Sequence, residues 1–266
     1  MKAFINGINL AYEDAGSGPA VMLIHGFPLC RKMWRPQRNK LPLSGYRVIA
    51  PDLRGFGESD APDGPYSMEL YADDLIGLMD HLEIEKAVIG GMSMGGYVLF
   101  NLLERYPERF RGAIFITTRA TADDEAGKAK RLQLAMDVQK FGPQVVADSF
   151  EKLLFAPGTP LERPKLVEEV YSWMVENATT GLAGGLLAMR ERKDYSPLLG
   201  NFRVPALAIG AEFDQAAPPA TSSAIAAGIP GCRLAIIPAT GHLANLEDVK
   251  AFNSPVLDFL ASLPQT

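Results

Sequence analysis

The most regular feature of the chain is a series of short, continuous apolar runs separated by longer segments of mixed character. These runs lie at residues 21–24, 47–50, 87–90, 113–116, 206–209 and 234–237. A strand that is apolar on both faces is buried on both faces, which is typical of a parallel sheet covered by helices. The runs therefore predict an α/β protein built around a mostly parallel sheet.

Other segments have the periodicity of helices or of a hairpin. Residues 68–79 repeat apolar side chains at three- and four-residue spacing behind Ser67, a residue suited to capping a helix N-terminus. A final helix is expected around residues 249–260. Residues 4–12 alternate around an Asn-Gly pair, which predicts an antiparallel hairpin at the start of the sheet.

The alternation of strands and helices is interrupted between about Thr121 and Lys193. This stretch has a helical pattern, Gly-Pro and Pro-Gly pairs, and no strand-like apolar run. A chain of 266 residues can form one core, and the alternation resumes after the interruption. We therefore expect a single domain (1–266), with a core formed by residues 1–120 and 194–266 and an inserted helical cap of about 121–193.

Composition and charge limit the kinds of binding partner and the cellular compartment that we expect. The net charge of −5 argues against a nucleic-acid partner, which normally meets a concentrated basic face. The densest basic stretch, 31–40, is expected to be a solvated helix face, although it could attract an anionic substrate. Two distant cysteines suggest neither a disulfide framework nor a metal site. With no apparent secretory signal or membrane span, we expect a cytoplasmic protein with no membrane association.

Ser93 is the strongest candidate for chemistry. It lies in Gly91-Met92-Ser93-Met94-Gly95-Gly96, after a strand-like run and before a helix-like segment. Neighbouring glycines allow a serine to occupy a strained turn between strand and helix, the arrangement called a nucleophile elbow. A small-residue turn in a buried connection is the alternative interpretation of the same pattern.

A serine hydroxyl needs an adjacent base to act as a nucleophile, and the chain has three histidines. His81 lies at a helix end, which favours a surface or capping role. His25 ends an apolar strand, where a structural hydrogen bond is expected. His242 follows the last apolar strand in a short loop before a helix. His242 is therefore the predicted base.

The base needs a carboxylate to orient it, and Asp214 is the predicted partner. Asp214 follows the strand at 206–209, so a parallel sheet would bring it to the same edge as Ser93 and His242. Glu212 and the pair Asp123-Asp124 also follow strands and remain alternatives. The chain order Ser, Asp, His is the one expected for this architecture.

Two backbone N–H groups could stabilise the oxyanion formed during acyl transfer. One is that of Met94, at the start of the helix after the elbow. The other is that of Phe27, in the turn His25-Gly26-Phe27-Pro28 after the first parallel strand. Pro28 has no N–H to offer. A purely structural turn is the alternative for this loop.

With these residues assembled, the chain resembles the α/β-hydrolase superfamily over nearly its whole length. The resemblance rests on residues 25–28, Asp52-Leu53-Arg54-Gly55-Phe56-Gly57-Glu58-Ser59, the elbow, and Gly241-His242. It implies a mostly parallel eight-stranded sheet flanked by helices, with an inserted cap. It also implies a Ser93–Asp214–His242 triad and oxyanion donors at Phe27 and Met94, with residues 52–59 as a structural loop.

Within that superfamily the chain is most like the 3-oxoadipate enol-lactonase and small carboxylesterase branch. This narrower resemblance rests on residues 93–96, on Tyr106-Pro107-Glu108-Arg109 and on the helical cap. It implies a small ester or lactone as substrate, with neither a metal nor an organic cofactor. Haloalkane dehalogenases and epoxide hydrolases of the superfamily place an aspartate where this chain has Ser93, so the resemblance does not favour their chemistry.

The substrate pocket has weaker signals. Bulky side chains that could line it come from the cap and the strand ends: Trp34, Met92, Trp173, Met174, Leu186 and Met189. Arg119 follows the strand at 113–116 and could pair with a substrate carboxylate. For each of the bulky side chains a place in the core is favoured over the pocket, and for Arg119 a place at the surface is favoured.

The sequence thus predicts a serine hydrolase of the carboxylesterase or lactonase type. Three alternatives stay open: a slow-turnover ligand sensor on the same scaffold, a carbon–carbon bond hydrolase or hydroxynitrile lyase, and a perhydrolase. Pro28 is the residue that suggests the last of these. Oligomeric state and physiological substrate have no signature in the sequence.

Overall fold

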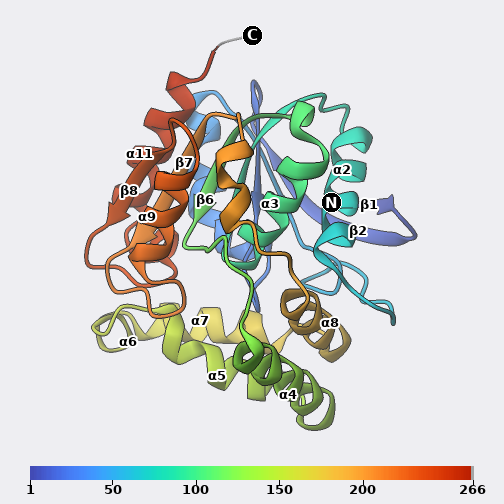
Figure 1. Cartoon of the computed structure of the whole chain (residues 1–266). Coiled ribbons are helices and arrows are strands. Elements are labelled where there is room, and N and C mark those ends of the chain that lie inside the picture. The colour runs from blue at the N-terminus through green and yellow to red at the C-terminus, as the bar shows by residue number, and fades with distance from the viewer. Residues whose placement is uncertain (265–266) are drawn as a thin grey trace.

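An eight-stranded sheet forms the centre of the protein in the computed structural model, which describes residues 1–264 (Figure 1). The strand order is β1-β2-β4-β3-β5-β6-β7-β8. The strands are β1 (Lys2–Ile5), β2 (Ile8–Ala15), β3 (Ala20–Ile24), β4 (Arg47–Pro51), β5 (Ala87–Met92), β6 (Phe110–Ile116), β7 (Ala206–Ala211) and β8 (Arg233–Ile237). Every apolar run singled out in the sequence is a strand, and the α/β-hydrolase fold expected from the sequence is confirmed.

The sheet is antiparallel at one edge and parallel through the rest. β1 pairs with β2 around Asn6 and Gly7, whose positive φ angles of 46° and 81° form the predicted hairpin turn. β2 pairs antiparallel with β4, and the pairs from β4 to β8 are all parallel. The carboxyl ends of β5, β6, β7 and β8 therefore lie in a row along one edge.

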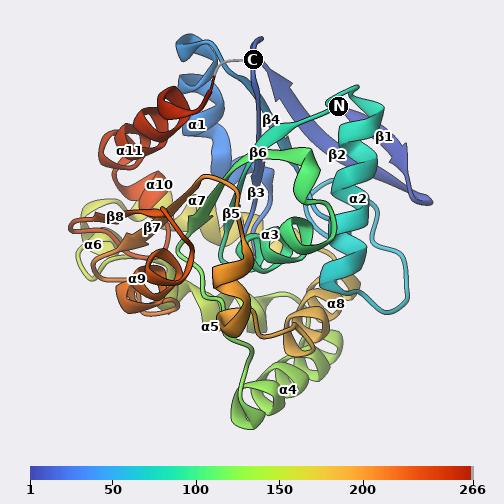
Figure 2. The same ribbon diagram turned by 45° about the horizontal axis from the view of Figure 1, so that its top comes forward.

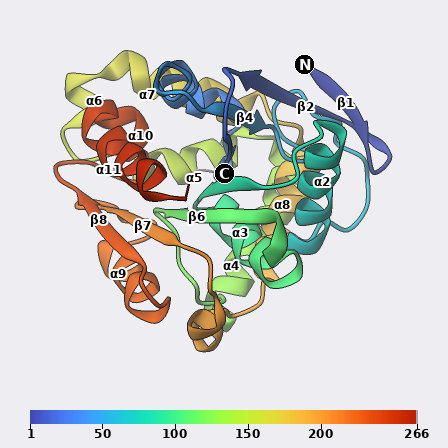
Figure 3. The ribbon, with the colours of Figure 1, turned by 90° about the horizontal axis from the view of Figure 1, so that it is seen from above.

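Helices cover both faces of the sheet, as the continuously apolar strands require. The short helix α1 (Arg35–Lys40) and α11 (Val249–Ser262) lie on one face, and α2 (Met68–His81), α3 (Met94–Arg105) and α9 (Pro219–Gly228) lie on the other (Figures 2 and 3). Successive strand residues alternate between two core clusters: Met22 and Ile24 belong to one, Val21 and Leu23 to the other. Ser67 caps α2 as predicted, since its Oγ accepts a hydrogen bond from the Leu70 N–H at 3.1 Å.

Five helices lie together in a separate layer between β6 and β7 in chain order (Figure 1). They are α4 (Glu125–Phe141), α5 (Gln144–Leu154), α6 (Thr159–Glu162), α7 (Pro164–Val175) and α8 (Thr179–Arg190). We call residues 125–190 the cap segment. A 3-10 helix, η4 (Ser196–Asn201), leads from it back to β7, and a short helix, α10 (Ala244–Glu247), precedes α11.

The basic stretch 31–40 is only in part the solvated helix face expected from the sequence, because Arg31 is buried. It forms a 3-10 helix, η1 (Arg31–Trp34), followed by α1, and Arg31 is only 7% exposed. The Arg31 guanidinium pairs with the carboxylate of Asp52, whose side chain is fully buried. A buried carboxylate needs a counterion and hydrogen bonds, and this demand draws Arg31 inward.

The remaining basic side chains of that stretch do lie at the surface. Lys32, Arg35 and Arg38 pair there with carboxylates of other segments. Among residues 1–264, no helix is both long enough and apolar enough to cross a membrane.

Candidate active site

Ser93 occupies a strained turn between β5 and α3. Its φ and ψ angles are 52° and −113°, a conformation that non-glycine residues rarely adopt. A Cβ on Gly91 would lie 2.3 Å from the Gly95 carbonyl oxygen, and one on Gly95 would lie 2.6 Å from that of Ile24. The flanking glycines are therefore required by close backbone contacts, and the turn presents a partly exposed Ser93 side chain beyond the end of β5.

His242 and Asp214 form a buried pair at the ends of β8 and β7. His242 Nδ1 lies 2.7 Å from Asp214 Oδ2, and the two residues are 2% and 4% exposed. The second oxygen, Asp214 Oδ1, accepts hydrogen bonds of 2.8 Å from the N–H groups of Ala216 and Ala217. A carboxylate satisfied in this way accepts a hydrogen bond from the Nδ1–H group, which leaves the Nε2 lone pair of His242 free to act as a base.

Ser93 and His242 approach each other without a direct hydrogen bond. Neither Ser93 Oγ nor His242 Nε2 has a hydrogen-bond partner within residues 1–264. Their backbones are nevertheless close, because the consecutive residues Thr117 and Thr118 bond to the His242 and Ser93 carbonyl oxygens, respectively. Such catalytic hydrogen bonds are often long in ligand-free enzymes and tighten when substrate binds.

The loop after β3 lies against Ser93 and carries an unpaired backbone donor. A Cβ built on Gly26 would lie 3.2 Å from the Ser93 Cβ and 2.4 Å from the Met92 sulfur. The next N–H along this loop, that of Phe27, has no acceptor within the described residues, and neither has the Met94 N–H at the start of α3. These two N–H groups are the donors that the sequence singles out for an oxyanion.

His25 has the structural role expected from the sequence. Its Nε2 accepts a hydrogen bond from the Leu53 N–H, and its Nδ1 donates to the Gly26 carbonyl oxygen, each at 3.0 Å. Both ring nitrogens are thus engaged, and burial lowers the pKa of His25, so the ring is held neutral. His81 is exposed at the end of α2, as expected.

The alternative carboxylates are engaged elsewhere. Asp123 pairs with Arg131 and Arg192. Asp124 caps α4 by accepting from the Gly127 N–H, and Glu212 accepts from the Ala239 N–H. In the part of the chain that the structure describes, no three His, Cys, Asp or Glu residues are grouped to hold a metal ion.

The expected pocket residues differ in their placement. Trp34 is fully buried in the core on the α11 side of the sheet, with its ring 6.5 Å from that of Phe252. Trp173 and Met189, on the cap helices α7 and α8, are 4% and 3% exposed. Met92, Met174 and Leu186 are also buried. Close packing in the core accounts for Trp34 without a ligand.

Arg119 is half-buried, and its guanidinium is directed at the protein backbone. One Nη2 hydrogen donates to the carbonyl oxygen of Ala216, beside Asp214, and Nε is buried without a partner within residues 1–264. From the sequence, Arg119 was expected at the surface, where it could pair with a substrate carboxylate; in the structure its guanidinium bonds to a carbonyl of the loop that carries Asp214.

Asn177, between α7 and α8, is a contact that the sequence analysis missed. Its Nδ2 donates to the Pro28 carbonyl oxygen at 2.8 Å, and its Oδ1 accepts from the Gly57 N–H at 2.7 Å. Asn177 therefore ties the cap segment to the Phe27 loop and to the loop at residues 52–59. A single asparagine in a helical segment carries no sequence signal for such a contact.

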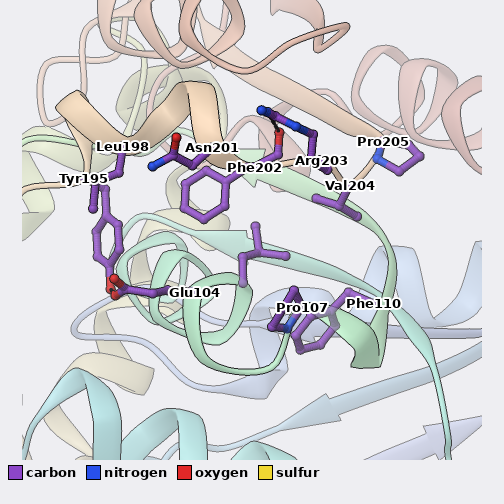
Figure 4. A pocket seen from close by; sticks show the side chains of 11 residues that line it. Glu104, Pro107, Phe110, Tyr195, Leu198, Asn201, Phe202, Arg203, Val204 and Pro205 are labelled. Carbon is purple, nitrogen blue, oxygen red and sulfur yellow. Dashed lines mark hydrogen bonds between the residues drawn. The ribbon is translucent and has the colours of Figure 1, made fainter.

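A cavity of about 520 Å³ opens on another side of the molecule (Figure 4). It lies between α3 and η4, beside Phe110 at the start of β6 and Pro205 just before β7. These are the amino ends of the strands, whereas Ser93, Asp214 and His242 follow the carboxyl ends. The cavity is therefore separate from the candidate active site.

Comparison with known proteins agrees with this architecture. A family model described as alpha/beta hydrolase fold matches residues 19–249. A thermophilic esterase from Thermogutta terrifontis, solved with malate bound, superposes with a TM-score of 0.96 at 37% identity, covering 100% of this chain and 99% of the esterase.

Two curated relatives differ in how much of the chain they match. The 3-oxoadipate enol-lactonase 2 of Acinetobacter baylyi is 30% identical over 94% of this chain and 91% of its own length. An epoxide hydrolase of Caballeronia sordidicola is 38% identical, but over only 48% of this chain and 40% of its own length. The likeness to the enol-lactonase and to the esterase extends over nearly the whole chain, and the chain belongs to the alpha/beta hydrolase fold family.

Proposed function

We propose that this hydrolase cleaves carboxylic esters or lactones through an acyl-enzyme formed on Ser93. The observation that carries the proposal is that the strained Ser93 turn and the His242–Asp214 pair, joined at 2.7 Å, lie at the same edge of the sheet, at the carboxyl ends of β5, β8 and β7. This combination supplies a nucleophile, a base and an orienting carboxylate in one place.

In the proposed reaction, Ser93 Oγ attacks the substrate carbonyl carbon as His242 Nε2 takes the hydroxyl proton. Collapse of the tetrahedral intermediate breaks the bond to the alcohol oxygen, and His242 returns the proton to that oxygen. Water then attacks the acyl-enzyme with His242 again as base, which releases the acid and restores the serine. Asp214 keeps the proton on Nδ1 and stabilises the imidazolium in each half-reaction.

The unpaired N–H groups of Phe27 and Met94 are proposed to receive the oxyanion. Donors of this kind stabilise charge that develops only in the transition state. The Met94 N–H also lies at the N-terminus of α3, where the helix dipole favours negative charge. No metal or organic cofactor takes part in the proposed steps.

The substrate class rests on the relatives and on the identity of residue 93. The full-length likeness is to an esterase and an enol-lactonase. Epoxide hydrolases of the superfamily use an aspartate at the nucleophile position, whereas this chain has Ser93, so acyl transfer is favoured over epoxide opening. Esters and lactones react by the same acyl chemistry, so the residues that line the substrate pocket determine which of them is bound.

Replacement of Ser93 tests the proposal. Ser93→Ala should abolish turnover of p-nitrophenyl acetate while the melting temperature stays close to that of the wild type. A panel of short esters, lactones and an enol-lactone would then define the substrate class. Steady turnover supports an enzyme, whereas a single stoichiometric burst on every substrate would favour a ligand sensor. Undiminished turnover by Ser93→Ala would refute the assignment.

A further inference from the structure

Three consecutive residues after β6 each bond to a different loop of the candidate triad. Thr117 Oγ1 donates to the carbonyl oxygen of His242 at 3.2 Å, and Thr118 Oγ1 donates to that of Ser93 at 2.8 Å. The Arg119 guanidinium donates to the carbonyl of Ala216, two residues after Asp214. One short segment, residues 117–119, thus bonds to the backbone of each of the three triad loops.

The position of this segment follows from sheet topology. β6 lies between β5, which carries Ser93, and β7, which carries Asp214, and β8 with His242 is the next strand. Among the described residues, the segment 117–119 therefore follows the one strand that lies between the strands of the Ser93 and Asp214 loops. The backbone of this segment is also bonded to the neighbouring strand, because the Thr117 N–H donates to the Ile209 carbonyl oxygen of β7 at 2.7 Å.

Thr117 is held in an unfavourable backbone conformation to make its contact. Its φ angle is +40°, in the left-handed region that a β-branched residue rarely adopts. Such strain persists only where the surrounding structure fixes it. Thr117 is fully buried, so its hydroxyl has no water to bond to, and the His242 carbonyl oxygen is its partner.

Thr118 connects the Ser93 turn to α9, the helix that follows the Asp214 loop. While its hydroxyl bonds to the Ser93 carbonyl oxygen, its own carbonyl oxygen accepts a hydrogen bond from Thr221 Oγ1 at 2.9 Å, at the start of α9. A Cβ on Gly96 would lie 2.4 Å from Thr118 Oγ1, so the threonine is packed directly on the helix that follows the elbow. Thr118 is fully buried and cannot move without disturbing the Ser93 turn.

Arg119 completes the arrangement on the Asp214 side. The Ala216 carbonyl oxygen accepts from Arg119, and the N–H of the same peptide unit, that of Ala217, donates to Asp214 Oδ1. The guanidinium therefore fixes the peptide that orients the carboxylate, rather than the carboxylate itself.

We propose that Thr117, Thr118 and Arg119 are positioning residues that hold the Ser93, His242 and Asp214 loops in mutual register. We call residues 117–119 the triad brace. The inference rests on the proposed function, because it assigns a role to residues that act through the triad. Since Ser93 Oγ and His242 Nε2 are not directly bonded, the brace would set the distance over which the proton is transferred, and small displacements there are costly.

The test compares hydroxyl-deleting and hydroxyl-retaining variants. Thr117→Val and Thr118→Val keep the side-chain shape but remove the donor, whereas Thr117→Ser and Thr118→Ser keep the donor. Ser222→Ala is the control for loss of a buried hydroxyl next to the brace: Ser222 donates to the Ile209 carbonyl oxygen, which also accepts the Thr117 N–H, but its hydroxyl bonds to no triad loop. Readouts are kcat and KM for p-nitrophenyl acetate, the rate of inactivation by a fluorophosphonate, and the melting temperature.

We expect each valine variant to lower kcat by about ten- to a hundredfold, the scale of a small misplacement of reacting groups, with little change in KM. The fluorophosphonate rate should fall in parallel, and the serine variants should restore both. Ser222→Ala should retain wild-type kinetics. The proposed role of the brace would be refuted if Ser222→Ala lost as much kcat as the valine variants, or if the valine variants lost none.

Arg119→Met provides an independent variant should a buried valine prevent folding. If Arg119 is a positioning residue, this change should lower kcat to the same extent for neutral and anionic esters. A rise in KM confined to anionic esters would instead assign Arg119 to substrate binding and remove it from the brace. Ser93→Ala separates the two proposals: if it is inactive while all brace variants are fully active, the proposed function stands and the brace falls.

Discussion

The triad edge of the sheet and the cap segment are held in place by different means. At the triad edge, neighbouring parallel strands and backbone hydrogen bonds fix the loops, as in the bond of 2.9 Å from the Ser93 N–H to the Ile116 carbonyl oxygen. The cap segment is joined to the core mainly by packed apolar side chains, such as Phe150 against Phe27 with ring centroids 5.1 Å apart, and by polar side chains such as the buried Asn177. The fixed edge suits the reaction, whereas the cap segment can vary with the substrate.

Glu247 adds a polar connection between the two regions. Its Oε2 accepts from the Gly241 N–H at 2.6 Å, next to His242, and its Oε1 accepts from the Ala156 N–H at 2.8 Å in the cap segment. One carboxylate therefore bridges the loop of the base and the cap segment. Changes at the triad edge should reduce kcat on every substrate, whereas changes in the cap segment should alter stability and substrate preference.

The largest effect is expected from Asp214→Asn at the triad edge. The asparagine would preserve the shape of the side chain but favour the wrong tautomer of His242, so kcat should fall by about 10⁴. The melting temperature should change little. Steady-state kinetics on p-nitrophenyl acetate measure this loss, and Glu212→Gln serves as the control for the alternative carboxylate. If Glu212→Gln lost more kcat than Asp214→Asn, Glu212 and not Asp214 would be the carboxylate that orients His242.

A smaller but substantial loss is expected from Gly26→Ala in the loop after β3. The new methyl group would meet the Met92 sulfur at 2.4 Å and the Ser93 Cβ at 3.2 Å, which would shift the Phe27 N–H. Loss of one oxyanion donor costs about 10²–10³ in kcat. Gly200→Ala is the matched control, because a Cβ there meets nothing within 4 Å. Similar kcat values for the two variants would argue against this loop as part of the oxyanion site.

The link between the two regions is tested by Asn177→Ala. It would leave the buried Pro28 carbonyl oxygen without its partner and remove the acceptor of the Gly57 N–H, at a cost of about 1–3 kcal/mol in the free energy of unfolding. We expect kcat to fall by about tenfold or less, with changes in KM that differ between short and long esters. The exposed Asn39→Ala is the control. Unchanged stability and substrate preference would show that the cap segment does not depend on this contact.

The smallest effect on catalysis is expected from Asp123→Asn at the base of the cap segment. Burial would raise the pKa of Asp123, but hydrogen bonds from Arg192 and Arg131 lower it to about 2. Because the folded-state pKa lies below the unfolded value, this carboxylate stabilises the fold above about pH 4 and ceases to do so as the pH falls towards 2.

Asp123→Asn should therefore lower the melting temperature at pH 7 and flatten its decline between about pH 4 and 2, with kcat little changed. Thermal unfolding as a function of pH measures both effects. A melting curve as steep in acid as that of the wild type would show that other groups control acid stability.

The sequence predicted the order of strands and helices along the chain but not the side-chain contacts between distant segments, for a physical reason. Strands buried on both faces leave continuous apolar runs, and their parallel order brings the residues after each strand to one edge. Ser93, Asp214 and His242 could therefore be singled out from chain order, although their catalytic roles remain predictions. The burial of Arg31 and the contact of Asn177 depend on partners far away in sequence, for which local pattern carries no signal.

Thr117, Thr118 and Trp34 show the same limit within the core. The two threonines follow a predicted strand, but their roles rest on which carbonyl each hydroxyl reaches in the folded chain. Trp34 was a candidate for the pocket on account of its size, yet its ring is fully buried near Phe252. Side-chain type alone does not separate core from pocket when both are apolar.

The most direct test of the central claim is mass spectrometry of the enzyme quenched during turnover of a slowly hydrolysed p-nitrophenyl ester. The account predicts a mass increase of one acyl group per chain, located on the peptide that contains Ser93, appearing with the burst of p-nitrophenol and disappearing as substrate is consumed. Ser93→Ala should show neither burst nor adduct. Turnover without an adduct under conditions where deacylation is rate-limiting, or an adduct on a different residue, would contradict it.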